Sequence, residues 1–295
     1  MRLFVMPSSA RRRWLLWPAL AISSLLGAAG CGGGQALLHP AHTLPPGAVS
    51  AGAGVSGHFV LGSADAAIES ARSDATSVTA EQSEALTRGS LAVVALAPGV
   101  SPWRGARVGV GWEADAGLTY TGRAARADAR RAWELGPYAL SAGVGATGIF
   151  VRPGSDTPEQ RAVTESTGGI RGLDAGSVGG FGFDVPLLFG WRSDVDLVRL
   201  WVGIRGGYER LSGEFELDPA LSATPEPVRE PVTVRRWYGG ALVGIDVGVG
   251  PIRVAAELDG AYHRLSGSLG EGPGELTAEL DGFSLTPSGA LITHF

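Results

Sequence analysis

GARVGVGWEADAGLTYTGRAARADARRAWELGPYALSAGVGATGIFV, residues 105–151, is the stretch of sequence that decides the fold. Along 108–120 apolar side chains alternate with glycine, threonine and acidic residues, which is the period of two typical of a β-strand. The chain returns through 124–134, turns at 135–137, and rises again through 138–151. Each segment has one apolar and one polar face. A soluble sandwich shares this alternation, so the loops and the aromatic residues must decide the class.

The connections between segments alternate in length. Ten strand candidates can be counted after residue 50, at 51–62, 89–98, 105–121, 124–134, 138–151, 179–192, 197–214, 232–249, 252–268 and 276–295. Long polar connections occur at 63–88, 152–178 and 215–231, and short ones at 99–104, 135–137, 193–196 and 250–251. Outer-membrane barrels have short periplasmic turns and longer outside loops. The pattern therefore predicts that both ends of the barrel domain lie on the periplasmic side.

Aromatic residues fall near the two ends of these strands. The predicted periplasmic group is Trp103, Trp133, Tyr138, Trp191, Trp201 and Phe295. The predicted outer group is Phe59, Tyr120, Phe150, Phe181, Phe183, Trp237, Tyr238, Tyr262 and Phe283. Aromatic rings favour the two interfaces of a bilayer, whereas a soluble sandwich would bury them at mid-strand. We predict an all-β fold, an antiparallel transmembrane β-barrel of about ten strands, with eight strands as the alternative.

The first thirty residues have the features of an export signal. Three arginines at 11–13 precede an apolar run at 14–26 and the small residues 27–30, which end at the single cysteine, Cys31. This arrangement resembles a bacterial lipoprotein signal, and the resemblance implies a lipid attached to Cys31. We predict a signal peptide at 1–30, a flexible tether at 31–50 that leads from the lipidated Cys31, and the barrel at 51–295. Because the tether is rich in glycine and proline, ordered structure is not expected there.

The end of the chain also resembles a known class. Residues 291–295 read LITHF, and outer-membrane barrels resemble one another in ending on a strand whose last residue is phenylalanine. The resemblance implies that the barrel assembly machinery is a partner, recognising the strand that ends at Phe295, and that the barrel lies in outer-membrane lipid of a Gram-negative cell. The mature chain has 20 arginines against 29 acidic residues, a net charge of about −9. That balance argues against a nucleic-acid partner.

Placing the apolar faces outward gives the lumen a definite set of charged side chains. The predicted lumen residues are Glu113, Asp115, Arg126, Arg130, Asp184, Arg205, Glu209, Glu257, Asp259 and His263. Counting across the turns places Asp184 roughly opposite Arg205, and Asp115 roughly opposite Arg130. Opposite charges in a narrow lumen must pair, because an isolated buried charge costs several kcal/mol. A polar core that closes the barrel is the first hypothesis, and a narrow cation-favouring pore is the second.

No catalytic, cofactor or metal site can be assigned from the sequence, and we predict no enzyme activity. His263 and Asp259 share a face, as in the omptin proteases that also have ten strands, but residues four apart on a strand are about 13 Å apart. His58 should approach His263 around the barrel, although two histidines alone make a weak metal site. We predict an outer-membrane lipoprotein barrel with a structural or surface-interaction role. The alternatives are a narrow diffusion pore, a soluble periplasmic β-sandwich lipoprotein, and an outer-rim hydrolase.

Overall fold

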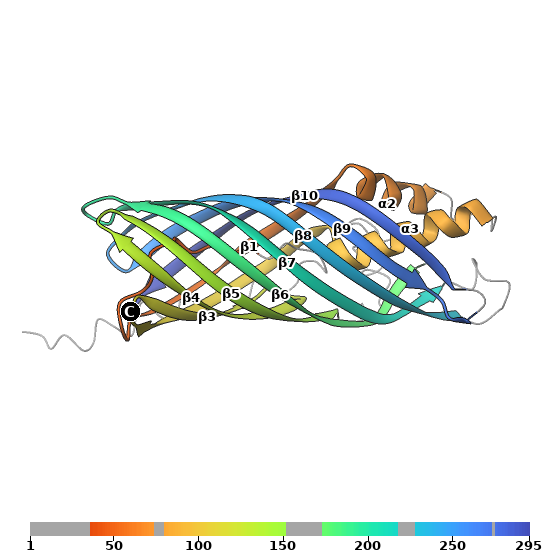
Figure 1. Cartoon of the computed structure of the whole chain (residues 1–295), viewed down its shortest axis with the longest axis horizontal. Coiled ribbons are helices and arrows are strands. Elements are labelled where there is room, and N and C mark those ends of the chain that lie inside the picture. Colours follow the sequence, from red (N-terminus) through yellow and green to blue (C-terminus); the bar gives the residue numbers. More distant parts are fainter. Residues whose placement is uncertain (1–35, 74–79, 152–172, 218–227, 273–274) are drawn as a thin grey trace, which may run out of the picture.

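The structure is a computed structural model that describes residues 36–73, 80–151, 173–217, 228–272 and 275–295. Ten antiparallel strands form one closed barrel, in which β1 pairs with β10 (Figure 1). The strands are β1 Val49–Leu61, β2 Gly99–Gly111, β3 Ala114–Tyr120, β4 Ala124–Leu135, β5 Tyr138–Val151, β6 Leu173–Arg192, β7 Val198–Leu217, β8 Val228–Val249, β9 Ile252–Leu269 and β10 Leu276–His294. The predicted fold class is confirmed.

The two ends of the barrel differ in their connections. One end holds the short links 112–113, 136–137, 193–197 and 250–251, and we call it the short-turn end. The opposite, long-loop end holds the connections 62–98, 152–172 and 218–227. At the short-turn end, the backbone groups of Val49 and Phe295 hydrogen-bond to each other at 2.8 and 3.2 Å. The first and last strands therefore begin and end together, as the loop pattern predicted.

Two of the predicted strands are wrong, and the errors compensate in the strand count. Residues 89–98 were predicted as a strand, but 80–96 form a helix, because the apolar run 91–96 is continuous and does not alternate. Residues 105–121 were predicted as one strand, but they contain the end of β2, a tight turn and β3. Trp112 and Glu113 form this turn with φ values of 52° and 56°, the backbone of a two-residue hairpin loop.

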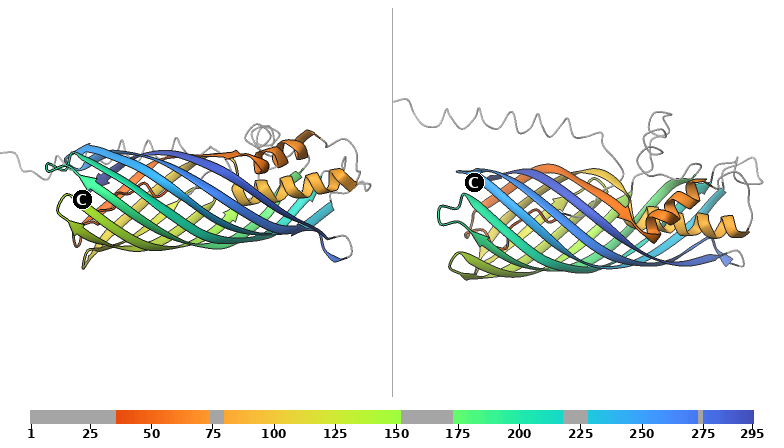
Figure 2. Two further views of the ribbon diagram at one scale, coloured as in Figure 1. Left: turned by 45° about the horizontal axis from the view of Figure 1, so that its top comes forward. Right: turned by 90° about the horizontal axis from the view of Figure 1, so that it is seen from above.

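Two helices close the long-loop end from inside. Helices α2 Ser63–Ser73 and α3 Ala80–Leu96 contact each other, and α3 contacts β8, β9 and β10 (Figure 2). A methyl group at Gly267 would meet Leu91, and one at Gly282 would meet Ala64, so both helices lie against the inner wall. Their apolar side chains form one buried cluster with inward residues of the strands. Neither described helix is long and apolar enough to cross a bilayer.

The segment before β1 lies inside the barrel at the opposite end. Residues 36–42 are buried, and Leu37, Leu38 and Ala41 share an apolar cluster with the inward-facing Trp103 and Trp201. The prediction of a flexible tether is therefore wrong for residues 36–48, because their side chains and backbone groups find partners on the inner wall. Residues 31–35, which include Cys31, lie outside the described residues.

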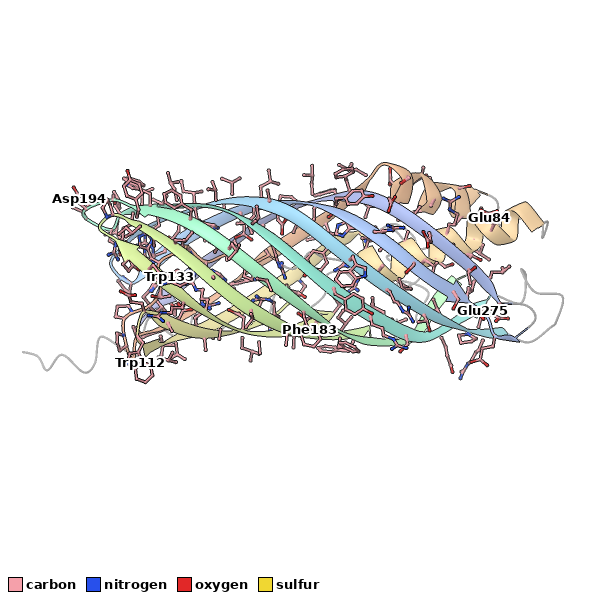
Figure 3. All side chains as sticks on the ribbon, viewed as in Figure 1. Glu84, Trp112, Trp133, Phe183, Asp194 and Glu275 are labelled. Carbon is pink, nitrogen blue, oxygen red and sulfur yellow. The ribbon has the colours of Figure 1, made fainter. Side chains whose placement is uncertain are left out.

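The outer wall of the barrel is apolar. Along β6, residues 181, 183, 185, 187 and 189 are exposed, and each is phenylalanine, valine or leucine. Trp112 and Trp133 mark the short-turn end, Glu84 and Glu275 lie at the long-loop end, and Phe183 lies between them (Figure 3). Water-soluble proteins rarely expose apolar area on this scale. The outer wall is therefore that of a barrel embedded in a lipid bilayer.

Three predicted interface aromatics face the lumen instead. Trp103 and Trp201 are 4% and 1% exposed, and their indole nitrogens donate hydrogen bonds to the carbonyl of Ala36 and to Glu257. The Tyr238 ring lies beside the guanidinium groups of two inward-facing arginines. Tryptophan and tyrosine pair an apolar body with one polar group. Inside this barrel the polar groups of the two tryptophans bind the inner wall and the N-terminal segment.

Candidate functional site in the barrel lumen

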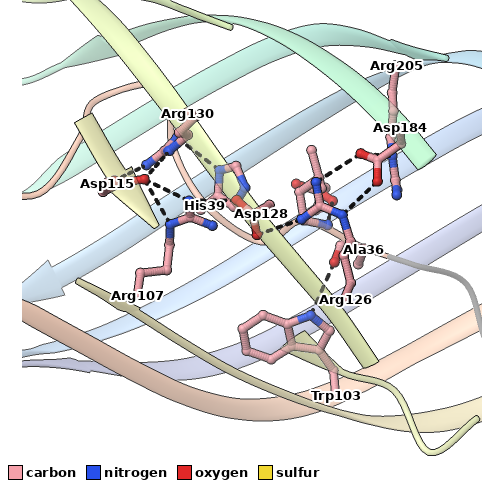
Figure 4. A network of polar contacts seen from close by, with 12 residues as sticks. Ala36, His39, Trp103, Arg107, Asp115, Arg126, Asp128, Arg130, Asp184 and Arg205 are labelled. Atoms are coloured by element: carbon pink, nitrogen blue, oxygen red, sulfur yellow. Dashed lines mark hydrogen bonds and ion pairs between the residues drawn. The ribbon is translucent and has the colours of Figure 1, made fainter. Parts of the chain in front are cut away.

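A ladder of ion pairs lines the inner wall from the short-turn end toward the middle of the barrel (Figure 4). Arg107 bridges two carboxylates, at 2.7 Å from Asp115 and 2.7 Å from Asp128. Arg126 continues the ladder, at 2.7 Å from Asp128 and 2.8 Å from Asp184. These residues come from β2, β3, β4 and β6, whose inward positions face one another in the closed barrel. The ladder therefore runs along the inner wall and links inward positions of the neighbouring strands β2 to β6.

The structure brings together both pairs that were counted across the turns. Arg205 Nε lies 3.1 Å from Asp184, and Arg130 Nε lies 2.8 Å from Asp115. All four side chains are less than a tenth exposed. Charges at this depth must be paired to be tolerated, and breaking such a pair costs about 3–5 kcal/mol. The charges of the ladder are thus buried and fully paired.

Arg130 also holds the N-terminal segment. Its guanidinium donates to the carbonyl of Pro40 and, at 3.0 Å, to the carbonyl of His42. It lies 3.0 Å from His39 Nδ1, and because a guanidinium can only donate, that nitrogen must be the acceptor of a neutral ring. Leu44 N donates to Asp115 at 3.2 Å, on the same pair. One ion pair therefore binds four residues of the segment.

Glu257 on β9 holds the inner end of the same segment. Its two carboxylate oxygens accept hydrogen bonds from the backbone nitrogens of Leu37 and Leu38, at 2.7 and 3.0 Å. Trp201 donates a third hydrogen bond at 3.1 Å. Glu257 is buried, and these donors satisfy a carboxylate for which no described arginine forms an ion pair. The N-terminal segment therefore supplies hydrogen-bond donors that the buried carboxylate of Glu257 needs.

The histidines of the segment are held neutral. Burial, together with the positive charge of Arg130, lowers the pKa of His39 well below its ordinary value. Burial and the nearby Arg192 lower the pKa of His42 from 6.5 to about 4. Glu134 lies 3.7 Å from His42 and does not compensate for the loss of water. Protonation of either ring therefore favours the state in which the segment has left the lumen.

The inner end of α3 is held by arginines from the wall. Arg123 donates to the carbonyl of Val94 at 3.2 Å, and Arg236 donates to the carbonyl of Ala95 at 2.8 Å. Helix C-terminal carbonyls lack partners within the helix and carry partial negative charge, so arginine is a suitable cap. Ala97 follows with φ 42°, the left-handed residue that commonly ends a helix. The helix thus enters the barrel with its C-terminus innermost.

A polar cavity of about 40 Å³ lies beneath the inner end of α3. Its lining includes His58, Arg205, Arg236, Tyr238, Asp259, His263, Ser284 and Thr286. His58 Nδ1 contacts Thr286 Oγ1 at 2.9 Å, and His263 Nε2 contacts Ser284 Oγ at 2.7 Å. The second nitrogen of each ring is buried without a partner among the described atoms. Buried polar atoms of this kind commonly bind ordered water, and the cavity has room for it.

The cavity does not have the geometry of a catalytic site. His263 Nε2 meets a serine hydroxyl, but no described group orients the ring through Nδ1. A nucleophilic serine requires a base that is itself held by a third group. His58 and His263 do approach each other, with ring centroids 6.2 Å apart. No group of three metal-binding side chains occurs among the described residues.

The structure places nine of the ten predicted lumen residues inside. Asp115, Arg126, Arg130, Asp184, Arg205, Glu209, Glu257 and His263 are buried, and Asp259 lines the cavity. Glu113 is the exception, because it lies in the exposed turn between β2 and β3. Glu209 pairs with Arg236 at 2.6 Å. Sequence reasoning missed Arg107, although it shares the inward parity of Gly109 and Gly111 and could have been found by that signal.

No protein-family model and no curated protein sequence matches the chain. A major outer membrane protein from Thermus thermophilus is 11% identical, with a TM-score of 0.35 and coverage of 84% of this chain and 99% of that one. The CymD monoaromatic hydrocarbon channel is 10% identical, with a TM-score of 0.29 and coverage of 85% and 89%. The toluene transporter TbuX of Ralstonia pickettii is 11% identical, with a TM-score of 0.33 and coverage of 85% and 90%. Likenesses this distant carry no inference about a ligand.

Proposed function

We propose that the protein is an outer-membrane barrel whose lumen is a gated conduit for small polar solutes, closed at rest by the N-terminal segment at one end and by the helix α3 at the other. The observation that carries the proposal is that two separate segments occupy the lumen, one from each end, with a polar cavity at the inner end of the helical one. A small barrel can be filled by side chains of its own strands. Here residues 36–48 and the helix α3 do part of that work.

The N-terminal segment is suited to leave. Its contacts with the inner wall include hydrogen bonds to Arg130, Asp115, Glu257 and Trp103, together with the apolar contacts of Leu37 and Leu38. The segment runs into β1 at Val49, so it can swing out without breaking a strand pair of the barrel. The segment lies directly over Gly109 and Gly190, where a methyl group would meet Pro45 and Ala41, so the wall behind it carries no side chain at these two positions. Departure of the segment would therefore admit water to the short-turn end.

Conductance of the purified protein in a planar bilayer tests this proposal. The intact mature protein should be silent for most of the recording. A variant in which residues 36–44 are replaced by a glycine-serine linker of equal length should show frequent steps, because the linker lacks the side chains that pack inside the barrel. A gel-mobility shift on boiling shows whether each protein is folded. A folded linker variant as silent as the intact protein, also when Arg236→Ala frees the inner end of α3, would refute the gate.

A structural or surface-interaction role is the second candidate, and the helical pair α2 and α3 favours it. The pair occupies the long-loop end, where loops of membrane barrels meet the exterior. Many buried charges are also paired, as in a barrel that stays closed. The narrow, permanently open diffusion pore does not fit the described lumen. Silence of the linker variant would support the structural role, with the helical pair as the surface to test for binding.

Membrane assignment and lipidation are parts of the proposal. The apolar outer wall supports a bilayer location, and the signal-like residues 1–30 support export to the outer membrane of a Gram-negative cell. We propose a lipid at Cys31 and recognition of the strand ending at Phe295 by the assembly machinery. Mass measurement of the mature N-terminal peptide tests the lipid at Cys31. The variant Phe295→Ala tests recognition by the assembly machinery, with the amount of protein inserted in the outer membrane as the measurement. An unmodified Cys31 or normal insertion of the variant would contradict the respective point.

A further inference from the structure

Three arginines stand on the outer wall directly beyond an aromatic band. The band runs over four strands through Tyr208, Trp237, Tyr262 and Phe283, in which Tyr208 contacts Trp237 and Tyr262 contacts Phe283 with ring centroids 4.7 and 5.1 Å apart. The next outward residue toward the long-loop end is Arg210 on β7, Arg235 on β8 and Arg264 on β9. All three side chains are exposed. We call them the arginine cluster.

The arginines are close enough to act on one ligand. Arg210 and Arg235 are direct partners across the β7–β8 ladder. Arg264 is the partner of Trp237, so it is a diagonal neighbour of Arg235. Directly opposed residues have Cβ atoms about 4.5–5.5 Å apart, and diagonal ones about 7–8 Å, within reach of long side chains. Three guanidiniums can therefore converge above the aromatic band.

The charges of the cluster are poorly compensated. Within the described part of the chain, no acidic side chain forms an ion pair with Arg210 or Arg235. Arg264 is compensated in part, since Asp281 on β10 is its register partner and Glu279 lies 3.3 Å away, but these side chains are exposed and pairs of this kind contribute little. Like charges directly opposite on a sheet destabilise it. An external anion would remove that repulsion.

The position of the cluster selects the kind of anion. Aromatic bands of membrane barrels lie at the boundary between the acyl chains and the headgroups. Side chains one step beyond the band are therefore at headgroup depth, on the side of the long loops. Arginine binds phosphate oxygens through pairs of N–H donors and is the residue best suited to them. Free phosphate would lack the acyl chains that the apolar wall below the cluster can contact.

We propose that Arg210, Arg235 and Arg264 bind the phosphate groups of a phosphorylated lipid in the outer leaflet, whose acyl chains lie along the exposed residues of β7 to β9. This inference rests on the proposed membrane location and not on the gate. Such a lipid would be fixed to one sector of the wall, on the outside of strands that α3 contacts from the lumen. The other sectors described carry no comparable triad beyond the band.

Titration of the full-length mature protein in detergent with a bis-phosphorylated glycolipid tests the proposal, read by intrinsic tryptophan fluorescence and by lipid retained on the immobilised protein. Arg210→Gln and Arg235→Gln should each weaken binding about tenfold, the loss expected when a charge-assisted hydrogen-bonding pair is removed. Arg131→Gln is the matched control, since Arg131 is exposed on β4 toward the short-turn end. The control should bind like the unchanged protein.

Two control ligands identify what binds to the cluster, and a separate conductance recording distinguishes failure of the lipid site from failure of the gate. The dephosphorylated glycolipid should bind weakly, and inorganic phosphate at equal concentration should not displace the lipid. Equal binding by the cluster variants and the control, or displacement by inorganic phosphate, would overturn the lipid site. Each variant must keep its mobility shift on boiling; Arg210→Lys serves where Arg210→Gln does not fold. Conductance is recorded separately, so the lipid site and the gate can fail independently.

Discussion

Replacement of Asp184 by alanine tests whether the lumen is dry and closed. Asp184 accepts two hydrogen bonds from Arg126, at 2.8 and 2.9 Å, and one from Arg205 at 3.1 Å. The substitution removes the carboxylate on which two buried guanidiniums converge. The cost of leaving such a charge without its partner is about 3–5 kcal/mol. That is a large share of a typical folding free energy of about 5–15 kcal/mol.

Urea unfolding of the protein in lipid vesicles, followed by tryptophan fluorescence, measures the loss. For an m-value of about 2–3 kcal/mol per molar urea, the midpoint should fall by roughly 1–2 M. Asp184→Asn, which keeps the size and one acceptor oxygen, should lose less. Asp194→Ala removes a carboxylate from the exposed turn between β6 and β7 and should change stability by about 0.5 kcal/mol or less.

The double variant Asp184→Ala with Arg205→Ala completes a cycle that isolates the pair. Removing both partners should cost less than the sum of the single changes, with a coupling energy of about 0.5–3 kcal/mol. A loss below about 1 kcal/mol for Asp184→Ala would refute the reasoning, because it would show that water screens these charges as it does on a surface. The lumen would then be hydrated at rest, and an open pore would have to be reconsidered.

Other contacts in the lumen lead to three more expected outcomes. Because the pKa of His42 is lowered from 6.5 to about 4, the docked segment loses up to about 3 kcal/mol of stability from this group as pH falls from 6.5 to 4. Channel steps should become more frequent at pH 5 than at pH 7.5, and His42→Gln should reduce this dependence while His39 keeps part of it. Arg236→Ala should free the inner end of α3 and speed proteolysis of the 62–98 connection, measured by mass spectrometry, without such an effect in Arg131→Ala. Gly244→Ala should destabilise the barrel by about 1–3 kcal/mol in urea unfolding, since a methyl there overlaps the Trp201 ring, whereas Gly239→Ala meets nothing within 4 Å and should be tolerated.

The alternation of side chains predicted the barrel because the outward side chains of each strand are mostly apolar and the inward ones are more polar. On β6, the phenylalanines at 181, 183 and 189 face outward and Asp184 faces inward, as the period of two requires. The same rule could not locate the turn at Trp112 and Glu113. A two-residue hairpin preserves alternation, so the sequence continues across the turn without a break. Only the left-handed backbone of these two residues shows the reversal.

Aromatic placement was a weaker guide than alternation. Trp133 and Tyr138 are exposed near the short-turn end, where the sequence placed them. Trp103 and Trp201 occupy inward positions, because their N–H groups have partners on the N-terminal segment and on Glu257. The N–H group of a tryptophan can therefore find a hydrogen-bond acceptor inside the lumen as well as at a membrane interface. Strand parity should have taken precedence over residue type for these two.

The N-terminal segment was missed because glycine and proline near its ends resemble a linker. Two signals inside the sequence nevertheless indicate an insert. The run Ala36-Leu37-Leu38 is more apolar than a solvated tether requires, and Glu257 is an inward acid for which the neighbouring strands offer no arginine, since its register partners are Gly244 and Ser288. A buried carboxylate must find donors somewhere. When the strands of a barrel supply too few, the donors must come from a segment that enters the lumen, and here they are the backbone nitrogens of Leu37 and Leu38.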